Sequence, residues 1–233
     1  MKNLAIVLLT YASSIDSPRH QYAMKTMEAL HKYIRYSGEI HWHIADDGSP
    51  KEHILSLRTN ENVTVTCSDR RGYGASYNLA TQALHSHCEY FLMVEDDWEL
   101  TKELNLDQLI EALDDGLGCI RLGYLGWTQE LRGKIIAKAN QTFLLLDPDS
   151  PEPHVWSGHP RLETREFQRQ IGPWPEGIDP GSTEFVVAKR TESRYGVVWP
   201  LDLGIRAGQI HGTLFEHTGA IQAREDQNVA TAS

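Results

Sequence analysis

The sequence predicts an α/β fold in which a mostly parallel sheet is flanked by helices. In the first half of the chain, short apolar runs alternate with segments whose apolar residues recur at helical spacing. The apolar runs are continuous and rich in branched residues, which is typical of strands buried on both faces. The chain has 233 residues, 40% of them hydrophobic and 23% charged, which is enough for one sizeable core. A single domain over residues 1–233 is the prediction.

Four strands and four helices are predicted in the first half, in alternation. The strands are expected over residues 4–9, 40–45, 63–67 and 90–94, and the helices over residues 18–36, 51–57, 73–87 and 106–113. The second strand ends in a turn that contains Gly48 and Pro50. This order is the pattern of parallel strands joined by crossover helices.

The second half of the chain is less regular. Strands are predicted in "CIRLGYLG" and "TFLLLD", and helices over residues 163–170 and 183–195. Residues 147–181 contain seven prolines, so this segment is not expected to be mostly helix or central strand. It is too rich in Trp and Phe for a disordered linker, so we expect ordered loops that cover a binding site. The polar tail after Arg224 is expected to fray.

The bulk properties narrow the class of protein. A net charge of -10 argues against broad, non-specific binding to nucleic acid. No apolar run approaches the roughly 20 residues that span a bilayer, and Leu4 to Leu9 is too short for a signal peptide. Three cysteines without metal-type spacing predict buried free thiols in a reducing compartment. We therefore expect a soluble, cytoplasmic protein without a membrane segment.

Three of the first four predicted strands end in polar clusters. These clusters are Thr10-Tyr11, Asp46-Asp47-Gly48-Ser49 and Glu95-Asp96-Asp97. They should meet at one edge of the sheet, outside the carboxyl ends of the strands, where ligands bind. Crowded carboxylates stay ionised more easily around a cation, and hard oxygen ligands suit Mg²⁺ or Mn²⁺. The alternatives are an acidic first turn of a helix for "EDD" and a plain turn for "DDGSP".

Four motifs give the chain a resemblance to a known family. "IVLLTYASS", "HIADDGSP", "DRRGYGASYNLATQAL" and "FLMVEDDWEL" follow one another in the first hundred or so residues. In this order they resemble the nucleotide-sugar-dependent glycosyltransferases of the GT-A fold, most closely the family-2 type. The resemblance implies a Rossmann-like sheet with a smaller irregular region, so that residues 1–100 bind the nucleotide sugar and residues 101–233 bind the acceptor.

The resemblance also implies roles for individual residues on the donor side. Thr10 and Tyr11 should flank the nucleobase and ribose, and Asp47 should hydrogen-bond the base. Arg71 should lie near the nucleotide, with Arg70 as the second choice. The implied metal ligand is Asp97, while Asp96 should hold the ribose or the waters of the metal, and Glu95 is then only a flanking residue.

On the acceptor side, the resemblance implies a catalytic base at the start of a late helix. "STEFVVAKRTESRYG" fits this shape, with Glu184 in the acidic position and Phe185 where a second acid usually stands. The alternative is that Glu184 merely sits in the first turn of a capped helix. Asp179 is the second candidate for the base, although an Asp before Pro is ordinary in a turn.

The late histidines and the tryptophans are further candidates. His217, in "GTLFEHTGA", is the implied second metal ligand, and His211 is a weaker candidate. A surface or core histidine is the alternative for both. Trp156, Trp174 and Trp199 are expected in the core, with stacking on an acceptor as a second use.

The implied function is metal-dependent transfer of a sugar from a nucleotide diphosphate sugar, a UDP-sugar by this resemblance, to a hydroxyl acceptor. The cofactor would be Mn²⁺ or Mg²⁺, and the stereochemistry inverting, as in the similar family. A nucleotidyltransferase acting on sugar phosphates is one alternative, although no glycine-rich loop follows the first strand. An inactive sugar-nucleotide-binding module is another. The acceptor stays open among a glycan, a lipid-linked sugar, a protein and a hydroxymethylated base, so that nucleic acid enters only as an acceptor.

Overall fold

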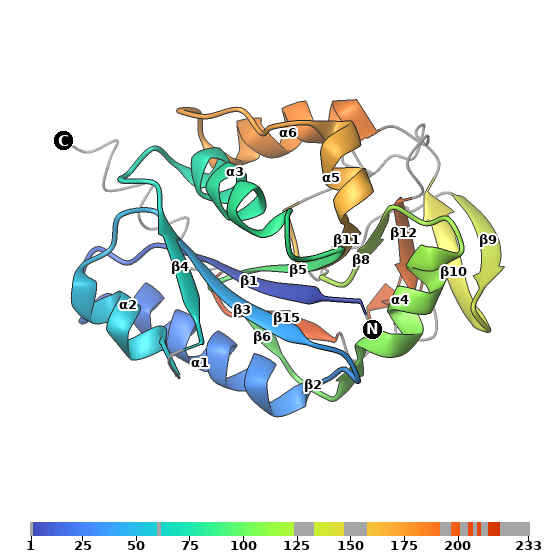
Figure 1. Cartoon of the computed structure of the whole chain (residues 1–233), viewed down its shortest axis with the longest axis horizontal. Coiled ribbons are helices and arrows are strands. Elements are labelled where there is room, and N and C mark those ends of the chain that lie inside the picture. The colour runs from blue at the N-terminus through green and yellow to red at the C-terminus, as the bar shows by residue number, and fades with distance from the viewer. Residues whose placement is uncertain are drawn as a thin grey trace.

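A nine-stranded sheet forms the centre of the molecule (Figure 1). The structure is a computed structural model that describes residues 2–59, 62–123, 133–146, 158–191, 197–200, 205–206, 209–210 and 214–219. The strand order across the sheet is β4-β3-β1-β5-β11-β8-β12-β10-β9. Within this sheet, β10 and β11 run against the direction of the other strands. The predicted α/β fold with a mostly parallel sheet is therefore confirmed.

The four strands of the first half form a parallel block. They are β1 (Leu4–Thr10), β3 (Ile40–Asp46), β4 (Thr64–Cys67) and β5 (Tyr90–Glu95). β1 lies between β3 and β5, and β3 also pairs with β4. Every residue of β1 is buried, which explains why its apolar run does not alternate with polar residues.

The strands of the second half make the sheet mixed. They are β8 (Cys119–Arg121), β9 (Gly133–Lys138), β10 (Gln141–Leu146), β11 (Arg161–Thr164) and β12 (Val197–Pro200). β11 lies between β5 and β8 and is antiparallel to both, so a central strand does lie inside the proline-rich segment. Its neighbour Pro160 precedes the strand and removes no hydrogen bond from the ladder. Residues 124–126 of "CIRLGYLG" lie outside the described part of the chain.

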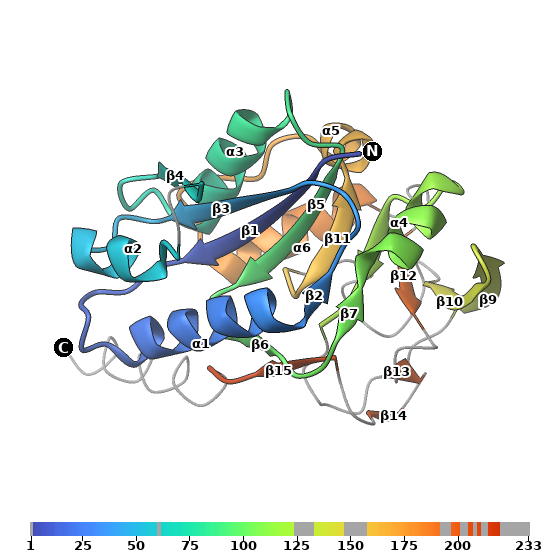
Figure 2. The same ribbon diagram turned by 60° about the horizontal axis from the view of Figure 1, so that its bottom comes forward.

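Helices cover both faces of the sheet (Figures 1 and 2). They are α1 (Pro18–Tyr33), α2 (Lys51–Leu57), α3 (Tyr73–Leu84), α4 (Leu106–Asp114), α5 (Arg165–Ile171) and α6 (Pro180–Thr191). α1, α2 and α4 pack on one face, and α3, α5 and α6 on the other, so two buried apolar clusters flank the sheet. Each predicted helix is present, α2 with the predicted ends and the others with at least one end shifted. α1 ends early because β2 (Ile34–Arg35) pairs with β7 (Leu104–Asn105).

Two further short ladders lie outside the main sheet. β6 (Trp98–Leu100) pairs antiparallel with β15 (Phe215–His217), and β13 (Ile205–Arg206) pairs with β14 (Gln209–Ile210). In the first ladder, His217 stands opposite Trp98, the residue that follows Asp97. This ladder therefore places a late histidine next to the acidic motif.

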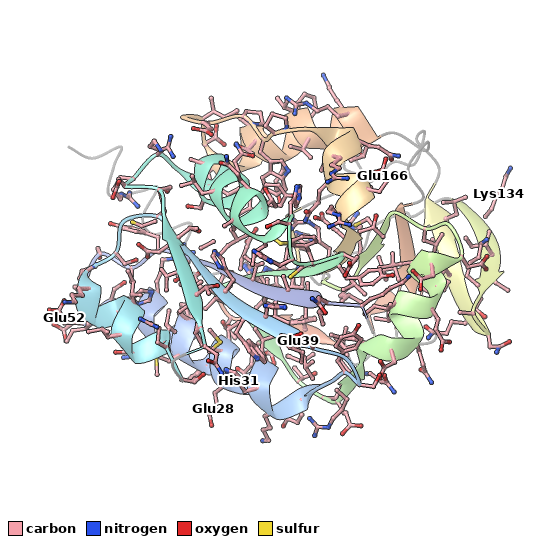
Figure 3. The ribbon with its side chains drawn as sticks, in the orientation of Figure 1. Glu28, His31, Glu39, Glu52, Lys134 and Glu166 are labelled. Atoms are coloured by element: carbon pink, nitrogen blue, oxygen red, sulfur yellow. The ribbon has the colours of Figure 1, made fainter. Side chains whose placement is uncertain are left out.

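The outer edge of the sheet is protected by charge. β9 is the last strand in the order, and Lys134 projects from it away from the molecule (Figure 3). Lysine on an edge strand discourages pairing with another chain, which matters here because Ile135 is 72% exposed.

All three cysteines are free. Cys88 and Cys119 are buried as predicted, whereas Cys67 is exposed at the end of edge strand β4, so the prediction is wrong for that residue. Among the described residues, no helix is long and apolar enough to cross a membrane.

Candidate active site

The polar strand ends meet at one edge of the sheet. The parallel register sets Thr10 beside Asp46 and Leu9 beside Glu95. The acids that follow β3 and β5 therefore lie on either side of the end of β1. This is the arrangement expected for parallel strands whose carboxyl ends form a binding edge.

Asp96 is fully buried, and protein groups satisfy both of its carboxylate oxygens. Oδ2 accepts hydrogen bonds from the Thr10 hydroxyl at 2.9 Å and from the Tyr11 N–H at 3.1 Å. Oδ1 accepts from the guanidinium of Arg19 at 2.6 Å. Burial raises the pKa of Asp96, and the charge of Arg19 opposes this effect. No motif singles out Arg19, which reaches Asp96 from the first turn of α1.

Two histidines lie behind Thr10. His53 Nε2 is 3.0 Å from the Thr10 hydroxyl, and His20 Nδ1 is 2.9 Å from His53 Nδ1. Burial, together with the neighbouring His20, lowers the pKa of His53 to about 4, so its imidazole is neutral near pH 7. A neutral imidazole here holds the Thr10 hydroxyl in place against Asp96.

The two acids of "DDGS" have different surroundings. Asp46 is fully buried, and its Oδ2 accepts from the N–H groups of Gly48 at 2.8 Å and Ser49 at 2.9 Å. Gly48 has a φ of 86°, a conformation that favours glycine. Asp46 therefore builds the turn, and Asp47 is left to face the next loop.

Asp47, in the turn between β3 and α2, contacts the loop between β4 and α3. Its Oδ1 accepts from the Ser68 hydroxyl and from the Gly72 N–H at 3.0 Å. Its Oδ2 lies 3.5 Å from the guanidinium of Arg70. That guanidinium also lies 3.5 Å from the centre of the Tyr11 ring, which is a cation–π contact.

Arg70, rather than Arg71, occupies the position next to Tyr11 and Asp47. Arg71 points elsewhere, since its Nε donates to the Ser68 carbonyl at 3.1 Å and its Nη1 lies 3.5 Å from Glu176. The left-handed backbone of Arg70, with a φ of 64°, turns its side chain toward Tyr11. The geometry thus favours the second choice of the sequence analysis.

Asp97 and His217 face each other across the β6–β15 ladder. His217 Nε2 lies 3.2 Å from Asp97 Oδ2. Burial raises the pKa of Asp97, but His217 and Arg19 outweigh it and leave that pKa below its ordinary value. The backbone is fixed as well, because the Thr218 N–H and hydroxyl both donate to the Asp97 carbonyl, at 2.8 and 3.1 Å.

This pair suits a divalent cation. Asp97 Oδ1 and His217 Nδ1 are buried and have no hydrogen-bond partner within the described residues. In an octahedral ion with ligands at about 2.1 Å, neighbouring ligand atoms are about 3 Å apart, close to the observed spacing of His217 and Asp97. The described residues contain no group of three or more His, Cys, Asp or Glu that could hold an ion. The remaining ligands would therefore be phosphate and water oxygens.

Glu184, Glu95 and Tyr73 converge beside Gly158. Glu184 Oε1 accepts from the Gly158 N–H at 2.5 Å, and the Tyr73 hydroxyl donates to Glu95 Oε1 at 2.6 Å. A Cβ on Gly158 would collide with Glu184 and would lie 2.6 Å from Tyr73 and 2.8 Å from Glu95. Burial raises the pKa of Glu95, and the charges of Asp97 and Glu184 add to this effect, which a cation held by Asp97 would oppose.

Asp179 has a structural task in the same region. Its Oδ1 accepts from the Ser182 N–H at 2.9 Å, which caps the first turn of α6. The hydrogen bonds with Ser182 lower the pKa of Asp179, whose side chain is exposed. Glu184 lies one turn further along α6 and is half-buried.

The other candidates are placed as follows. Trp174 is buried and stacks on Tyr77 with ring centres 3.7 Å apart, so it belongs to the core. Trp199 lies on β12. Trp156 and His211 lie outside the described residues.

Sequence reasoning missed a buried ion pair beneath Gly158. Arg161 and Glu163 are both fully buried on β11, with Nε and Oε1 2.5 Å apart. Arg161 Nη1 also donates to the Gly158 carbonyl at 2.7 Å, which fixes the backbone that holds Glu184. The alternation of charged residues in "RLE" at the start of a strand was the only signal for this pair.

The fold matches solved structures, although no protein-family model and no curated protein match the sequence. The chain has the fold of GT-A-type nucleotide-sugar glycosyltransferases. TarS 1-349 of S. aureus, in complex with UDP-GlcNAc, is similar with a TM-score of 0.63 at 14% identity, over 94% of this chain and 61% of that one. GalNAc-T7 with UDP, GalNAc and Mn²⁺ is similar with a TM-score of 0.58 at 14% identity, over 86% of this chain and 42% of that one.

A mannosyltransferase, PcManGT from Pyrobaculum calidifontis in complex with GDP-Man and Mn²⁺, is also similar. Its TM-score is 0.53 at 14% identity, over 97% of this chain and 61% of that one. The chain thus spans less than two thirds of the length of each of these structures.

Proposed function

We propose that the chain is a metal-dependent glycosyltransferase that moves a sugar from a nucleotide diphosphate sugar to a hydroxyl acceptor. The observation that carries the proposal is Asp97 at the binding edge of a GT-A-type sheet: its Oδ2 faces His217, and its buried Oδ1 has no hydrogen-bond partner within the described residues. Nucleotide-side groups lie on one flank of this pair, and Glu184 on the other. The similar structures of TarS with UDP-GlcNAc and of GalNAc-T7 with UDP and Mn²⁺ support the same reading.

In this proposal the nucleobase binds beside Tyr11 and Asp47. Asp47 Oδ1 already accepts from Ser68 and Gly72, so Oδ2 is the atom that accepts from the base. An acceptor oxygen suits the ring N–H of uracil, which supports a UDP-sugar as donor. Arg70 stacks on Tyr11 and would contact the base or its phosphates. Asp96 orders the ribose side indirectly, through Thr10 and the Tyr11 N–H.

The diphosphate would lie against Asp97 and His217. A bound Mn²⁺ or Mg²⁺ supplies positive charge that neutralises the leaving diphosphate. Asp97 suits this task because its lowered pKa favours the ionised carboxylate and one oxygen has no partner among the residues that the structure describes. In the described part of the chain, Arg19 already pairs with Asp96, and Arg161 with Glu163.

Glu184 is the proposed base for the acceptor hydroxyl. The Gly158 N–H holds one of its oxygens, which orients the carboxylate. Asp179, by contrast, is exposed, and it is engaged in capping α6. One base and one in-line attack suffice for an inverting transfer, because the acceptor hydroxyl loses its proton as it attacks the anomeric carbon. The first hundred or so residues then bind the donor, and the rest contribute the acceptor side.

Calorimetry with UDP, with and without Mn²⁺, followed by product analysis with UDP-GlcNAc and GDP-mannose, tests the proposal. The expected result is UDP or GDP binding that needs Mn²⁺, and slow release of the nucleotide from the matching sugar donor. Nucleotide binding without any turnover would instead indicate an inactive binding module. Formation of a nucleotide sugar from a nucleoside triphosphate and a sugar phosphate would indicate a nucleotidyltransferase. The acceptor, whether glycan, protein or hydroxymethylated base, is then sought by screening.

A further inference from the structure

We propose that Glu95 is a specificity-determining residue that accepts a hydrogen bond from a hydroxyl group of the transferred sugar. The proposal rests on the function proposed above, since it takes the sugar to lie between the metal pair and the base. Neither the acidic motif nor the resemblance assigns such a role, because Glu95 was expected only to flank the motif.

The first argument is the position of Glu95 at the end of β5. Glu95 is the last residue of β5 and Asp96 is the first residue of the turn that follows, and different elements hold their side chains. Asp96 is held on the side of α1 by Arg19, whereas Glu95 is held on the side of α3 by Tyr73. Glu95 thus lies between Asp97, which is two residues further along the chain, and Glu184, which also lies close to Gly158.

The second argument is the hydrogen bonding of its carboxylate. Tyr73 donates to Oε1, whereas no residue in the described part of the chain donates to Oε2. The side chain is half-buried, so it is neither saturated like Asp96 nor freely solvated. An ordered carboxylate with one spare oxygen at a binding edge is a specific acceptor for a ligand hydroxyl.

The third argument is the glycine at residue 158. A side chain there would collide with the oxygens of Glu184, Tyr73 and Glu95. Because glycine leaves this space open, the two carboxylates lie side by side over the backbone. Glu184 can then meet the acceptor hydroxyl while Glu95 meets a hydroxyl of the donor sugar near the reacting carbon.

The test compares a sugar nucleotide with the bare nucleotide in the presence of Mn²⁺. Calorimetry would measure the affinities for UDP and UDP-GlcNAc, or for GDP and GDP-mannose if the protein prefers guanine. The proteins are the wild type, Glu95→Gln, Tyr73→Phe and the control Glu166→Gln. Glu166 is an exposed carboxylate on α5 (Figure 3). Melting temperatures show whether each variant is folded.

The expected result is a loss confined to the sugar. In Glu95→Gln, an amide whose oxygen accepts from Tyr73 presents an N–H₂ group where Oε2 stood, so the sugar nucleotide should bind about 10- to 100-fold more weakly. UDP should bind as tightly as to the wild type. Tyr73→Phe should lose less, since it only frees the rotation of Glu95, and Glu166→Gln should lose nothing.

Two outcomes would overturn the proposal. An equal loss for UDP and UDP-GlcNAc would mean that Glu95 acts on the nucleotide or the metal. Unchanged affinity for both in Glu95→Gln would leave it without a role in binding the donor. A wild-type protein that binds neither UDP nor GDP with Mn²⁺ would overturn the proposed function itself, a result distinct from the other two.

Discussion

Adjacent residues Asp96 and Asp97 have opposite environments. Asp96 accepts three hydrogen bonds from the protein, with at least one on each oxygen. Asp97 has one buried oxygen without a partner in the described residues. A buried carboxylate with an unsatisfied oxygen costs stability unless something binds there. Asp96 therefore has a structural role, whereas the neighbouring Asp97 has an oxygen available for a ligand.

Substitution of each acid by asparagine should give different losses. Asp97→Asn should abolish Mn²⁺-dependent binding of UDP while the protein stays folded, because only the candidate metal ligand changes. Asp96→Asn should lower the free energy of unfolding by about 1–3 kcal/mol, because the amide cannot accept from Arg19, Thr10 and Tyr11 together. Urea unfolding and calorimetry measure the two quantities. Full activity of the wild type in EDTA would contradict the metal role of Asp97.

Glu184 and Asp179 are the two candidates for the catalytic base, and substitution of each one distinguishes them. Glu184→Gln should reduce sugar transfer by about 10²- to 10⁴-fold, the usual contribution of a positioned base, without changing the affinity for UDP. Asp179→Asn should keep most of the transfer rate, since asparagine also caps helices well. Initial rates with saturating donor provide the measurement. Wild-type transfer by Glu184→Gln, together with a slow Asp179→Asn, would assign the base to Asp179.

At the scale of elements, α3 and the loop that precedes α6 are clamped together. Asn78 accepts from the Trp174 N–H at 2.8 Å and donates to the Trp174 carbonyl at 3.0 Å. A Cβ on Gly74 would collide with the Pro175 carbonyl oxygen. Gly74 and Asn78 of "GYGASYN" therefore hold the loop that leads to α6 and Glu184.

In Gly74→Ala, the helix propensity of alanine and its collision with Pro175 should have opposite effects on the free energy of unfolding. Alanine favours a helix by about 1 kcal/mol over glycine, which alone would stabilise α3. The collision with Pro175 should outweigh this gain and lower the free energy of unfolding by about 1–3 kcal/mol, as overpacking does. Thermal or urea unfolding decides the sign. A more stable variant would mean that the loop moves aside easily and that the clamp is weak.

The pairing of β3 with β4 should make stability depend on pH. His43 is 2% exposed, with its ring nitrogens 2.8 Å from the Thr64 hydroxyl and 2.9 Å from the Thr66 hydroxyl. Burial lowers the pKa of His43 from 6.5 to about 4. Between these two values the unfolded chain binds a proton that the folded chain does not, so the free energy of unfolding falls as the pH falls.

From pH 7 to pH 5, His43 should account for a loss of about 2 kcal/mol in the free energy of unfolding. His43→Gln should reduce this loss, because glutamine does not titrate. His87→Gln is the control, since His87 is exposed. Urea unfolding at the two pH values checks the prediction, and identical pH profiles for His43→Gln and the wild type would contradict it.

At the scale of the whole molecule, the sequence predicts the first half of the fold better than the second. β1, β3, β4 and β5 follow from local sequence patterns, and they pair in parallel as expected for strands that are joined by crossover helices. β11 is a short strand with Arg161 and Glu163 buried in it, so its local pattern does not reveal a central strand. β15 is shorter still, and its partner β6 lies over a hundred residues earlier.

Some residues of the candidate site could likewise be predicted from the sequence, and others could not. Asp47, Asp97, Glu184 and His217 could be singled out because motifs surround them. Arg19, Tyr73 and Gly158 could not, because their importance comes from partners that are distant in sequence. The choice between Arg70 and Arg71 depended on backbone angles, which local composition does not determine.

Ligand binding should stabilise the molecule as a whole. A ligand that binds only the folded state, at a hundred times its dissociation constant, adds about 2.7 kcal/mol to the free energy of unfolding. Mn²⁺ and UDP together should therefore raise the melting temperature more than the sum of their separate effects. His217→Ala should weaken this joint effect, with Asp97 left as the single protein ligand. Differential scanning fluorimetry measures it, and additive shifts would contradict a shared site.

The β6–β15 ladder brings together Asp97 and His217, which are 120 positions apart. During synthesis, a ribosome completes the whole nucleotide-side sheet edge long before it adds the histidine. A growing chain would therefore carry its acidic motif through 120 further residues of elongation with half of its proposed cation-binding pair absent. Capture of the ion together with its nucleotide would begin only after residues 215–217 have emerged and paired, so the loaded site would mark a chain that has finished folding.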